Sequence, residues 1–325
     1  MEGGDIASGT TGRSFGWINT SLRPVPDPMG VLRRIAIQEY HRLEQELPEL
    51  AVQWIGALTY GAASEAMQGS DPADGVLMAT SARIRDLEPR LKHPPDQARF
   101  APEEGALDAV KATHTLIAGA QAHGAKVLTR TPVLRLLCRG SRLTGVETSV
   151  GMLEADMVVL AAGTGTEKLI EQFNVTLPVD ASPAIFIRYK PQPKLIHTII
   201  SSPAMEVRQD VDGVLFAAED YLDDSPDNQP AAVAQRTARA MEGELEGAAP
   251  VEPEWSCVGF RPIPRDGAPI IGYLPGTTGL YVCVMHPGVT LAAAVGRLAS
   301  EEIVHGVLDS SLDSYRPARF LQPRD

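Results

Sequence analysis

A continuous apolar run, Met157-Val-Val-Leu-Ala-Ala-Gly163, is the feature of this chain that most constrains its fold. Such a run predicts a strand buried on both faces of a parallel sheet, because a strand with one wet face would alternate apolar and polar side chains. A second run of the same kind, Leu280–Met285, precedes a helical pattern over 290–305. Strands of this type need helices on both sides of their sheet, so the chain is predicted to be an α/β protein.

An α-to-β unit and a small antiparallel meander precede the first apolar run. Residues 108–123 have helical spacing and end at Gly124, a residue suited to the position just after a helix. A short strand over 126–131 is predicted to follow, as in nucleotide-binding folds. Short strands separated by glycine turns over 133–156 predict the meander.

The remaining segments have a different character. A helix is predicted over 29–47 and a strand over 53–60, and residues 184–218 read as antiparallel strands followed by a helix over 229–246. The chain thus enters a nucleotide-binding type of module, leaves it and returns. The predicted domains are 1–50, 103–180 and 257–325 for this module, and 51–102 and 181–256 for an interleaved mixed-sheet α+β domain.

Composition limits the possible partners. The chain has 325 residues and a net charge of -12, which argues against nucleic-acid binding because phosphate neutralisation needs a basic face. Its three cysteines have no C-x-x-C or C-x-x-H spacing, so neither a disulfide framework nor a metal site is predicted. No apolar run approaches the length of a membrane span and no signal-peptide pattern is present, so we expect a cytoplasmic protein without an integral membrane segment.

Arg261 is the strongest candidate for a substrate-binding residue. It follows a strand-like run and lies between Phe260 and Pro262, which leave it little conformational freedom. A guanidinium presents a rigid fork of donors that suits a carboxylate. The alternative is a structural salt bridge to one of the abundant acids, and composition alone favours that alternative.

The stretch His286-Pro-Gly-Val-Thr-Leu291 lies where a predicted buried strand meets a helix. The first amides of a helix have no partners within it and carry partial positive charge, so they suit an anionic group. The alternative is that Gly288 permits a tight turn and that His286 is a structural histidine.

Two further glycine-containing stretches suit close approach of a cofactor. Residues 7–17 are too small and polar for a core element, although a terminus of this composition is often disordered. Ala161-Ala-Gly163 follows the buried strand, where glycine allows a backbone to approach a ligand, although any strand-to-helix turn can need glycine.

Together these stretches resemble the D-amino-acid oxidase and glycine oxidase family of FAD-dependent oxidoreductases. The resemblance rests on Cys257-Val-Gly-Phe-Arg-Pro-Ile-Pro-Arg-Asp-Gly-Ala-Pro-Ile-Ile-Gly272, on Met285–Leu291, on Ala7-Ser-Gly-Thr-Thr-Gly-Arg13 and on Ala161–Gly163. It implies an FAD-binding Rossmann-like domain and a mixed-sheet substrate domain, with Arg261 holding the substrate carboxylate. The resemblance also implies these FAD-contacting residues: Ser8, Thr10, Thr11, Gly12 and Arg13 at the pyrophosphate, Ala162 and Gly163 near the adenosine, the Val133 backbone at the adenine, and the backbone of Gly288, Val289, Thr290 and Leu291 at the flavin.

The activity implied by the resemblance is oxidation of a small amine or amino acid by hydride transfer to FAD, with no protein base required. The substrate would be a D-amino acid, glycine or an N-methyl amino acid, and the sequence leaves open which one, and whether oxygen or a quinone reoxidises the flavin. Noncovalent FAD is expected, because the loop over 7–17 contains no histidine and Cys257 lies two residues from the family's attachment position.

One departure from the family pattern concerns the dinucleotide-binding fingerprint. A strand and a Gly-x-Gly-x-x-Gly turn are expected just before Glu2, and the chain contains no copy of them. Their absence predicts two strands with unpaired edges and an exposed apolar face. Three explanations stay open: a late start of the sequence, a partner chain or homo-oligomer that supplies the unit, and a non-catalytic ligand-binding or interaction module. Retention of Arg261 and of the flavin loop weighs against the last.

Overall fold

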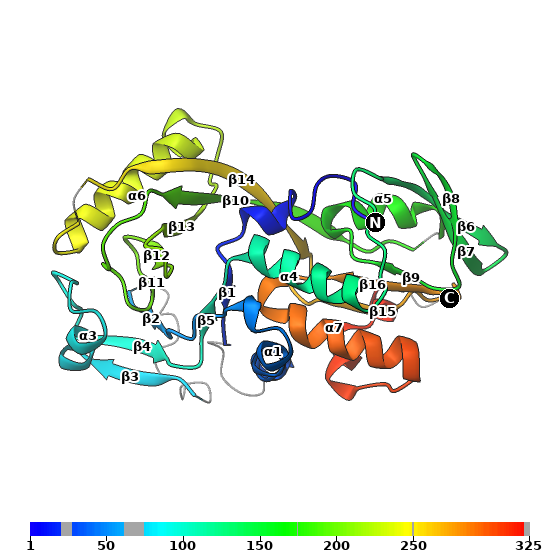
Figure 1. Cartoon of the computed structure of the whole chain (residues 1–325), viewed down its shortest axis with the longest axis horizontal. Helices are drawn as coiled ribbons and strands as arrows, with labels where there is room; N and C mark the ends of the chain where they lie inside the picture. Colours follow the sequence, from blue (N-terminus) through cyan, green and yellow to red (C-terminus); the bar gives the residue numbers. More distant parts are fainter. Residues whose placement is uncertain (21–27, 62–74, 174, 249, 322–325) are drawn as a thin grey trace.

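The computed structural model describes residues 1–20, 28–61, 75–173, 175–248 and 250–321. The molecule is elongated, with one large sheet at one end and several small sheets at the other (Figure 1). The two longest strands, β10 (Val179–Tyr189) and β14 (Pro253–Pro264), pair antiparallel and run from one end toward the other. This arrangement is the α/β fold with an additional mixed sheet that the sequence predicts.

The large sheet has eight strands in the order β14-β10-β13-β12-β11-β2-β4-β3. Its other members are β13 (Leu215–Asp220), β12 (Glu206–Gln209), β11 (Ile199–Ser201), β2 (Ala57–Thr59), β4 (Gln97–Ala101) and β3 (Leu77–Thr80). All pairs are antiparallel except β11 with β2, so the sheet is mixed. The strands predicted over 53–60 and 184–218 lie in this sheet.

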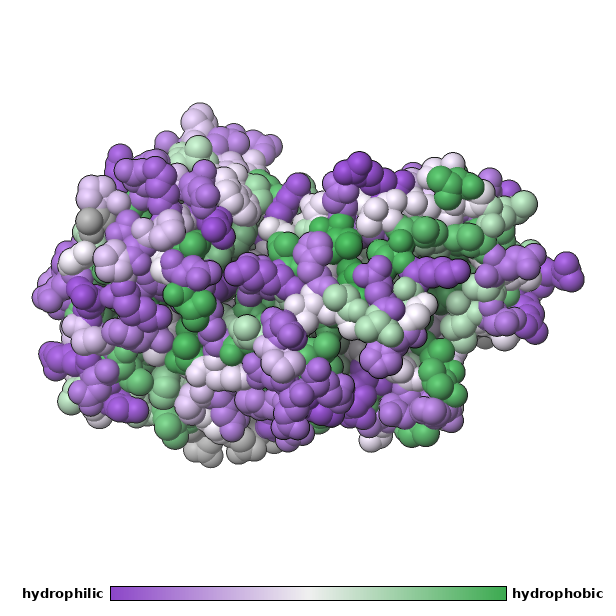
Figure 2. Space-filling model, viewed as in Figure 1, coloured by the Kyte–Doolittle hydropathy of each residue, from purple (hydrophilic) through white to green (hydrophobic). Residues whose placement is uncertain are grey.

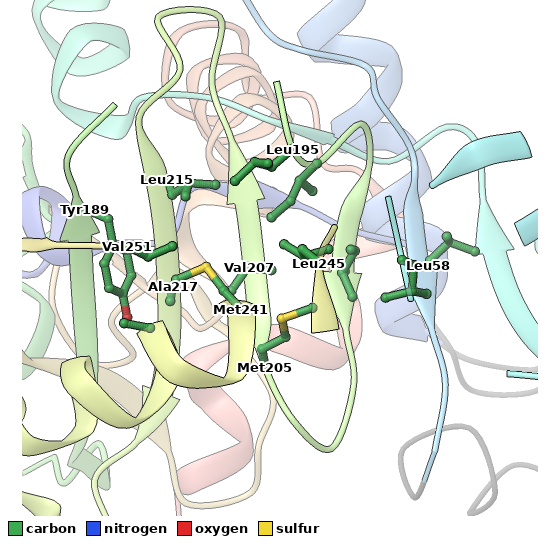
Figure 3. Close-up of a cluster of buried hydrophobic side chains, with 14 of the residues drawn as sticks. Leu58, Tyr189, Leu195, Met205, Val207, Leu215, Ala217, Met241, Leu245 and Val251 are labelled. Carbon is green, nitrogen blue, oxygen red and sulfur yellow. The ribbon is translucent and has the colours of Figure 1, made fainter. Parts of the chain in front are cut away.

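Helix α6 (Pro230–Glu244) covers one face of the large sheet. Met241 of this helix packs with Val207 and Leu215 in a fully buried cluster (Figure 3). Tyr189 points into the same cluster, and its hydroxyl donates to the Ala234 carbonyl at 3.0 Å. Because side chains alternate along a strand, the residues between these apolar positions point to the opposite face.

The second end of the molecule contains the two apolar runs. β9 (Val158–Leu160) pairs parallel with β16 (Leu280–Val284), which pairs antiparallel with β15 (Ile270–Tyr273). Helix α7 (Gly288–His305) follows β16 and packs with α1 (Pro28–Glu46) in one apolar cluster. Both helices and the parallel pairing are as predicted.

The prediction that the 157–163 run is buried on both faces is wrong. β9 is an edge strand of its three-stranded sheet, and the Val159 side chain is 48% exposed. β9 pairs with β16 along one edge, and its other edge has no strand partner in the ranges that the structure describes. The apolar side chains of β9 are therefore not all buried. Figure 2 shows apolar residues in a band above α4 (Ala109–Ala122), toward the end that contains α5 (Thr166–Ile170).

The meander and the unit before it complete this end. β6 (Val133–Arg139), β7 (Arg142–Thr148) and β8 (Gly151–Glu154) form the predicted three-stranded antiparallel sheet. The prediction of a strand over 126–131 is wrong: these residues form no regular strand, and Arg130 has φ +50, outside the extended region. The segment is instead hydrogen-bonded to the N-terminal residues, where the Glu2 amide donates to the Leu128 carbonyl and the Thr131 amide to the Glu2 carbonyl. Among the described helices, none is both long and apolar enough to cross a membrane.

Candidate active site

Strand β14 is the element on which the candidate site is built. The 3-10 turn Thr10–Arg13 lies along it: the Thr10 hydroxyl donates to the Phe260 carbonyl at 2.8 Å, and Arg13 Nη1 donates to the Val258 carbonyl at 3.2 Å. Gly259 makes this approach possible, because a Cβ there would lie 3.1 Å from the Arg13 Cβ. The predicted FAD loop is therefore fixed against the strand that carries Arg261.

Glycine is also required inside this turn. A Cβ on Gly12 would lie 2.3 Å from the Ala7 carbonyl oxygen, a distance that no side chain tolerates. The turn places Ser8, Thr11 and Arg13 at its exposed surface, where their polar atoms are accessible to a ligand.

A second turn meets β14 one residue beyond Arg261. The 3-10 turn Gly163–Gly165 follows β9, and a Cβ on Gly163 would lie 3.8 Å from Pro262 Cγ. Gly163 has φ +56, in the left-handed region that favours glycine, and Ala162 beside it is exposed. Two stretches that are far apart in the sequence thus converge on neighbouring residues of one strand.

Val133 lies elsewhere. It begins β6, half-buried against the apolar cluster of the meander. Its neighbour Pro132 approaches the N-terminal segment, with its Cα 3.7 Å from the position of a Cβ on Gly3. The structure therefore brings Val133 to the start of the chain rather than to Arg261.

Helix α7 presents an open N-terminus. Its N-cap is Pro287 with no side-chain cap hydrogen bond, and a Cβ on Gly288 would meet nothing within 4 Å. The Leu291 amide already donates to the Pro287 carbonyl at 3.2 Å and its side chain is in the core. The amides of Gly288, Val289 and Thr290 precede the first helical hydrogen bonds, so they are available to an electron-rich group.

The same helix end is attached to the segment that follows the FAD loop. Thr290 is fully buried, and its hydroxyl lies 3.0 Å from the Trp17 carbonyl and 2.9 Å from Asn19 Oδ1. Glu104 holds the other side of this segment: it accepts from Trp17 Nε1 at 2.7 Å and from the Thr20 amide at 2.7 Å. Glu104 was not predicted from the sequence, because a lone acid in a loop carries no local signal.

Glu104 is buried, and burial raises the pKa of its carboxyl to about 7 despite hydrogen bonds from Thr20 and Trp17 that lower it. A carboxyl whose pKa is raised in the folded protein contributes stability below its unfolded pKa and loses it as the pH rises through the folded pKa. Between pH 5 and 8 we therefore expect the free energy of unfolding of the wild type to fall by about 1–3 kcal/mol more than that of Glu104→Gln. Urea unfolding followed by tryptophan fluorescence measures the difference.

Glu103→Gln is the matched control, because Glu103 is the exposed neighbour of Glu104. It should keep the pH dependence of the wild type. Parallel pH profiles for Glu104→Gln and the wild type would show that the Glu104 carboxyl does not titrate in this range.

Arg261 points from β14 toward the strands next to it. Its Nη2 donates to Ser182 Oγ at 3.0 Å and to the Pro183 carbonyl at 3.3 Å, and it lies 3.5 Å from Asp220 Oδ1. Its Nε is buried and has no hydrogen-bond partner among the described residues. A buried donor left unpaired costs about 1–3 kcal/mol, so an incoming acceptor at this nitrogen would be stabilised.

His286 faces the same region. Burial, together with the positive charges of Arg261 and Arg33, lowers the pKa of its imidazole to about 4. The ring is therefore neutral near pH 7. This agrees with the interpretation of His286 as a structural residue rather than a general acid.

The chain is similar in sequence to known proteins. Residues 1–302 match the model of a family described as FAD dependent oxidoreductase. Glycine oxidase of Pseudomonas aeruginosa is 30% identical over 175 residues, covering 53% of this chain and 48% of that relative. A second glycine oxidase, from Pseudomonas putida, is 31% identical and 45% of it is covered, so the chain matches about half the length of these relatives.

Solved structures show the fold. Glycine oxidase from Bacillus cereus superposes with a TM-score of 0.81 at 21% identity, covering 96% of this chain and 91% of that one. L-proline dehydrogenase from P. horikoshii superposes with a TM-score of 0.83 at 19% identity, covering 98% and 90%. Both superpositions include the large sheet as well as the small sheets.

Proposed function

The chain belongs to the DAO family of FAD-dependent oxidoreductases, and from this premise we propose that it oxidises a small amine or amino acid with noncovalently bound FAD. The observation that carries the proposal is the buried, unpaired Nε of Arg261, on the strand where two cofactor-type turns meet. The substrate class is a D-amino acid, glycine or an N-methyl amino acid.

The residues available for FAD fit its chemistry. The hydroxyls of Ser8 and Thr11 and the Arg13 guanidinium would meet the pyrophosphate. Gly12 shapes the turn, and Thr10 fixes it to β14 because its hydroxyl donates to the Phe260 carbonyl. Ala162 and Gly163 would lie along the adenosine, and Val133 at the adenine. The amides of Gly288, Val289 and Thr290 in the first turn of α7 would face the flavin, whereas the Leu291 amide is paired with the Pro287 carbonyl. The open space at Gly288 suits a flat ring.

When bound, FAD supplies the hydride acceptor that the protein itself lacks. Arg261 would orient the substrate by its carboxylate, so that the carbon to be oxidised is held in one position. The partial positive charge at the start of α7 would stabilise electron density arriving beside it. A protein base is not required, in agreement with the low pKa of His286.

Noncovalent attachment is supported by two residue identities. Residues 1–20 contain no histidine, and burial raises the pKa of the Cys257 thiol, which keeps it in its less nucleophilic form. After acid precipitation of the protein, the flavin should therefore appear in the supernatant.

A second arrangement is that another chain, or a second copy, completes the cofactor site. The observation that favours it is β9, whose Val159 is exposed at the edge of its sheet. Strand edges of this kind accept further strands. FAD binding that depends on protein concentration would support this arrangement.

The experiment that tests the proposal is the visible spectrum of the purified chain, before and after addition of FAD, under anaerobic conditions. We expect a bound-flavin spectrum that bleaches on addition of glycine, sarcosine or a D-amino acid. A flavin spectrum that no amine or amino acid bleaches would contradict the enzymatic function. A chain that captures a carboxylate ligand without binding FAD would favour the binding-module alternative.

A further inference from the structure

Arg261 shares its face of the large sheet with two carboxylates. The register pairs Arg261 with Ser182, and it pairs Asp220 with Ala184 on the same face. Glu206 pairs with Ser201 in β11, and extension of the β12–β13 register places it opposite Ala218. Since paired residues point to the same side, Glu206, Asp220 and Arg261 all point away from α6.

This face is the one that meets the candidate active site. Arg208 lies two residues after Glu206 on β12 and therefore on the same face. It donates to the carbonyl of Phe15, which lies just before Trp17, at 2.7 Å. The Arg13 turn lies on the part of β14 that precedes Arg261. Glu206 and Asp220 therefore line the side of the sheet on which the substrate is proposed to bind.

Small side chains separate the charged ones. Ala184 and Ala218 are both part-exposed, whereas the large aromatic residues of the same face, Phe186 and Phe216, are buried further along the strands. Diagonal neighbours such as Glu206 and Asp220 have Cβ atoms about 7–8 Å apart. The alanines thus leave room over the sheet for an extended ligand between its charged residues.

Around Arg261 two acids share one cation, because Arg208, further along the same face, is hydrogen-bonded to the Phe15 and Leu107 carbonyls. Arg261 is the cation that lowers the pKa of Glu206, while burial and the negative charges of Glu219 and Asp220 raise it to about 7. The hydrogen bond from Ser201 to Glu206 is long, at 3.4 Å. When a substrate carboxylate binds to the Arg261 guanidinium, it shares the positive charge of Arg261 with Glu206 and Asp220. The negative charges of these two acids are then less fully neutralised.

We propose that Glu206 and Asp220 are specificity-determining residues for substrates with a cationic group remote from the carboxylate, as in a basic amino acid or an ω-amino carboxylate. Arg261 takes the carboxylate, and the remote cation lies over Ala184 and Ala218 between the two acids. This inference rests on the proposed function, because it places the substrate carboxylate at Arg261. It excludes dicarboxylates as preferred substrates, since a second anion would face two like charges.

The test compares two ligands that differ in one charge, 6-aminohexanoate and hexanoate, by calorimetry of the full chain under anaerobic conditions with FAD present. We expect the wild type to bind 6-aminohexanoate about 10–100-fold more tightly than hexanoate, a charge-assisted interaction of the usual size. In Glu206→Gln and in Asp220→Asn the ratio should fall by about 5-fold or more. Glu252→Gln, an exposed acid before the distant start of β14, should leave it unchanged.

The outcomes separate this inference from the function on which it rests. Equal binding of both ligands, unchanged in Glu206→Gln, overturns the role of the two acids while leaving Arg261 as the carboxylate site. Binding of both ligands that is unaffected by Arg261→Ala overturns the carboxylate site itself. Binding of either ligand does not require turnover, so a chain that oxidises neither compound still tests the inference.

Discussion

Arg261→Ala is expected to lower kcat/KM for a carboxylate-bearing amine by about 10²–10³-fold while leaving FAD bound. If Arg261 holds the substrate carboxylate as proposed, the substitution removes a charge-assisted interaction and leaves that carboxylate without its partner, an effect of about 3–4 kcal/mol. FAD should be retained, because neither turn that is proposed to hold it contacts the Arg261 side chain. The Thr10–Arg13 turn contacts the Val258 and Phe260 carbonyls, and the Gly163 turn approaches Pro262. Steady-state kinetics and the flavin-to-protein absorbance ratio measure the two quantities.

Two further variants sharpen this result. Arg261→Lys keeps the charge but loses the planar fork, so we expect it to recover part of the lost rate. Arg265→Ala removes an exposed arginine just after β14, which pairs with Asp180 at the surface, and it should change kcat/KM less than 2-fold. A KM and turnover that do not change in Arg261→Ala would show that this arginine serves the fold alone.

Local patterns were sufficient to predict most of the fold. Helix α7 was predicted from apolar spacing after a buried strand, and it ends where Gly306 adopts φ +68. The parallel pairing of β9 with β16 follows from the same two apolar runs. The exposure of Val159 could not be predicted, because burial depends on which strand lies alongside, and no property of the strand itself encodes its neighbour.

The residues that surround Arg261 could not be predicted for a related reason. Ser182 lies 79 residues from Arg261 in the sequence, and Glu104 lies 87 residues from Trp17. Each pair meets only through the register of strands and loops that the whole fold determines. Residues whose proposed roles come from a local motif, such as Gly12 and Gly288, could be named from the sequence, whereas Asp220, whose proposed role comes from a distant partner, could not.

Glu302→Ala is the substitution with the largest expected effect on stability. Glu302 is 1% exposed in α7, where its carboxylate accepts from the Tyr281 hydroxyl at 2.5 Å and from both terminal nitrogens of Arg316. Among the described residues, removing the acid leaves the Arg316 guanidinium with one weak hydrogen-bond acceptor, the Asp309 carbonyl at 3.4 Å, and leaves the Tyr281 hydroxyl unpaired. Breaking one partner of a buried ion pair costs about 3–5 kcal/mol, and urea unfolding measures the loss.

Asp313→Ala is the control for this prediction. Asp313 also faces Arg316, at 3.9 Å from its Nε, but its side chain is 71% exposed, so water screens the pair and the loss should stay within about 0.5 kcal/mol. The double variant Glu302→Leu with Arg316→Met should be more stable than Glu302→Ala, because it removes the uncompensated charge as well as the acid. If Glu302→Ala costs no more than Asp313→Ala, the tertiary contact between α7 and the C-terminal segment is maintained by apolar packing around Leu298 and Leu312 and not by this ion pair.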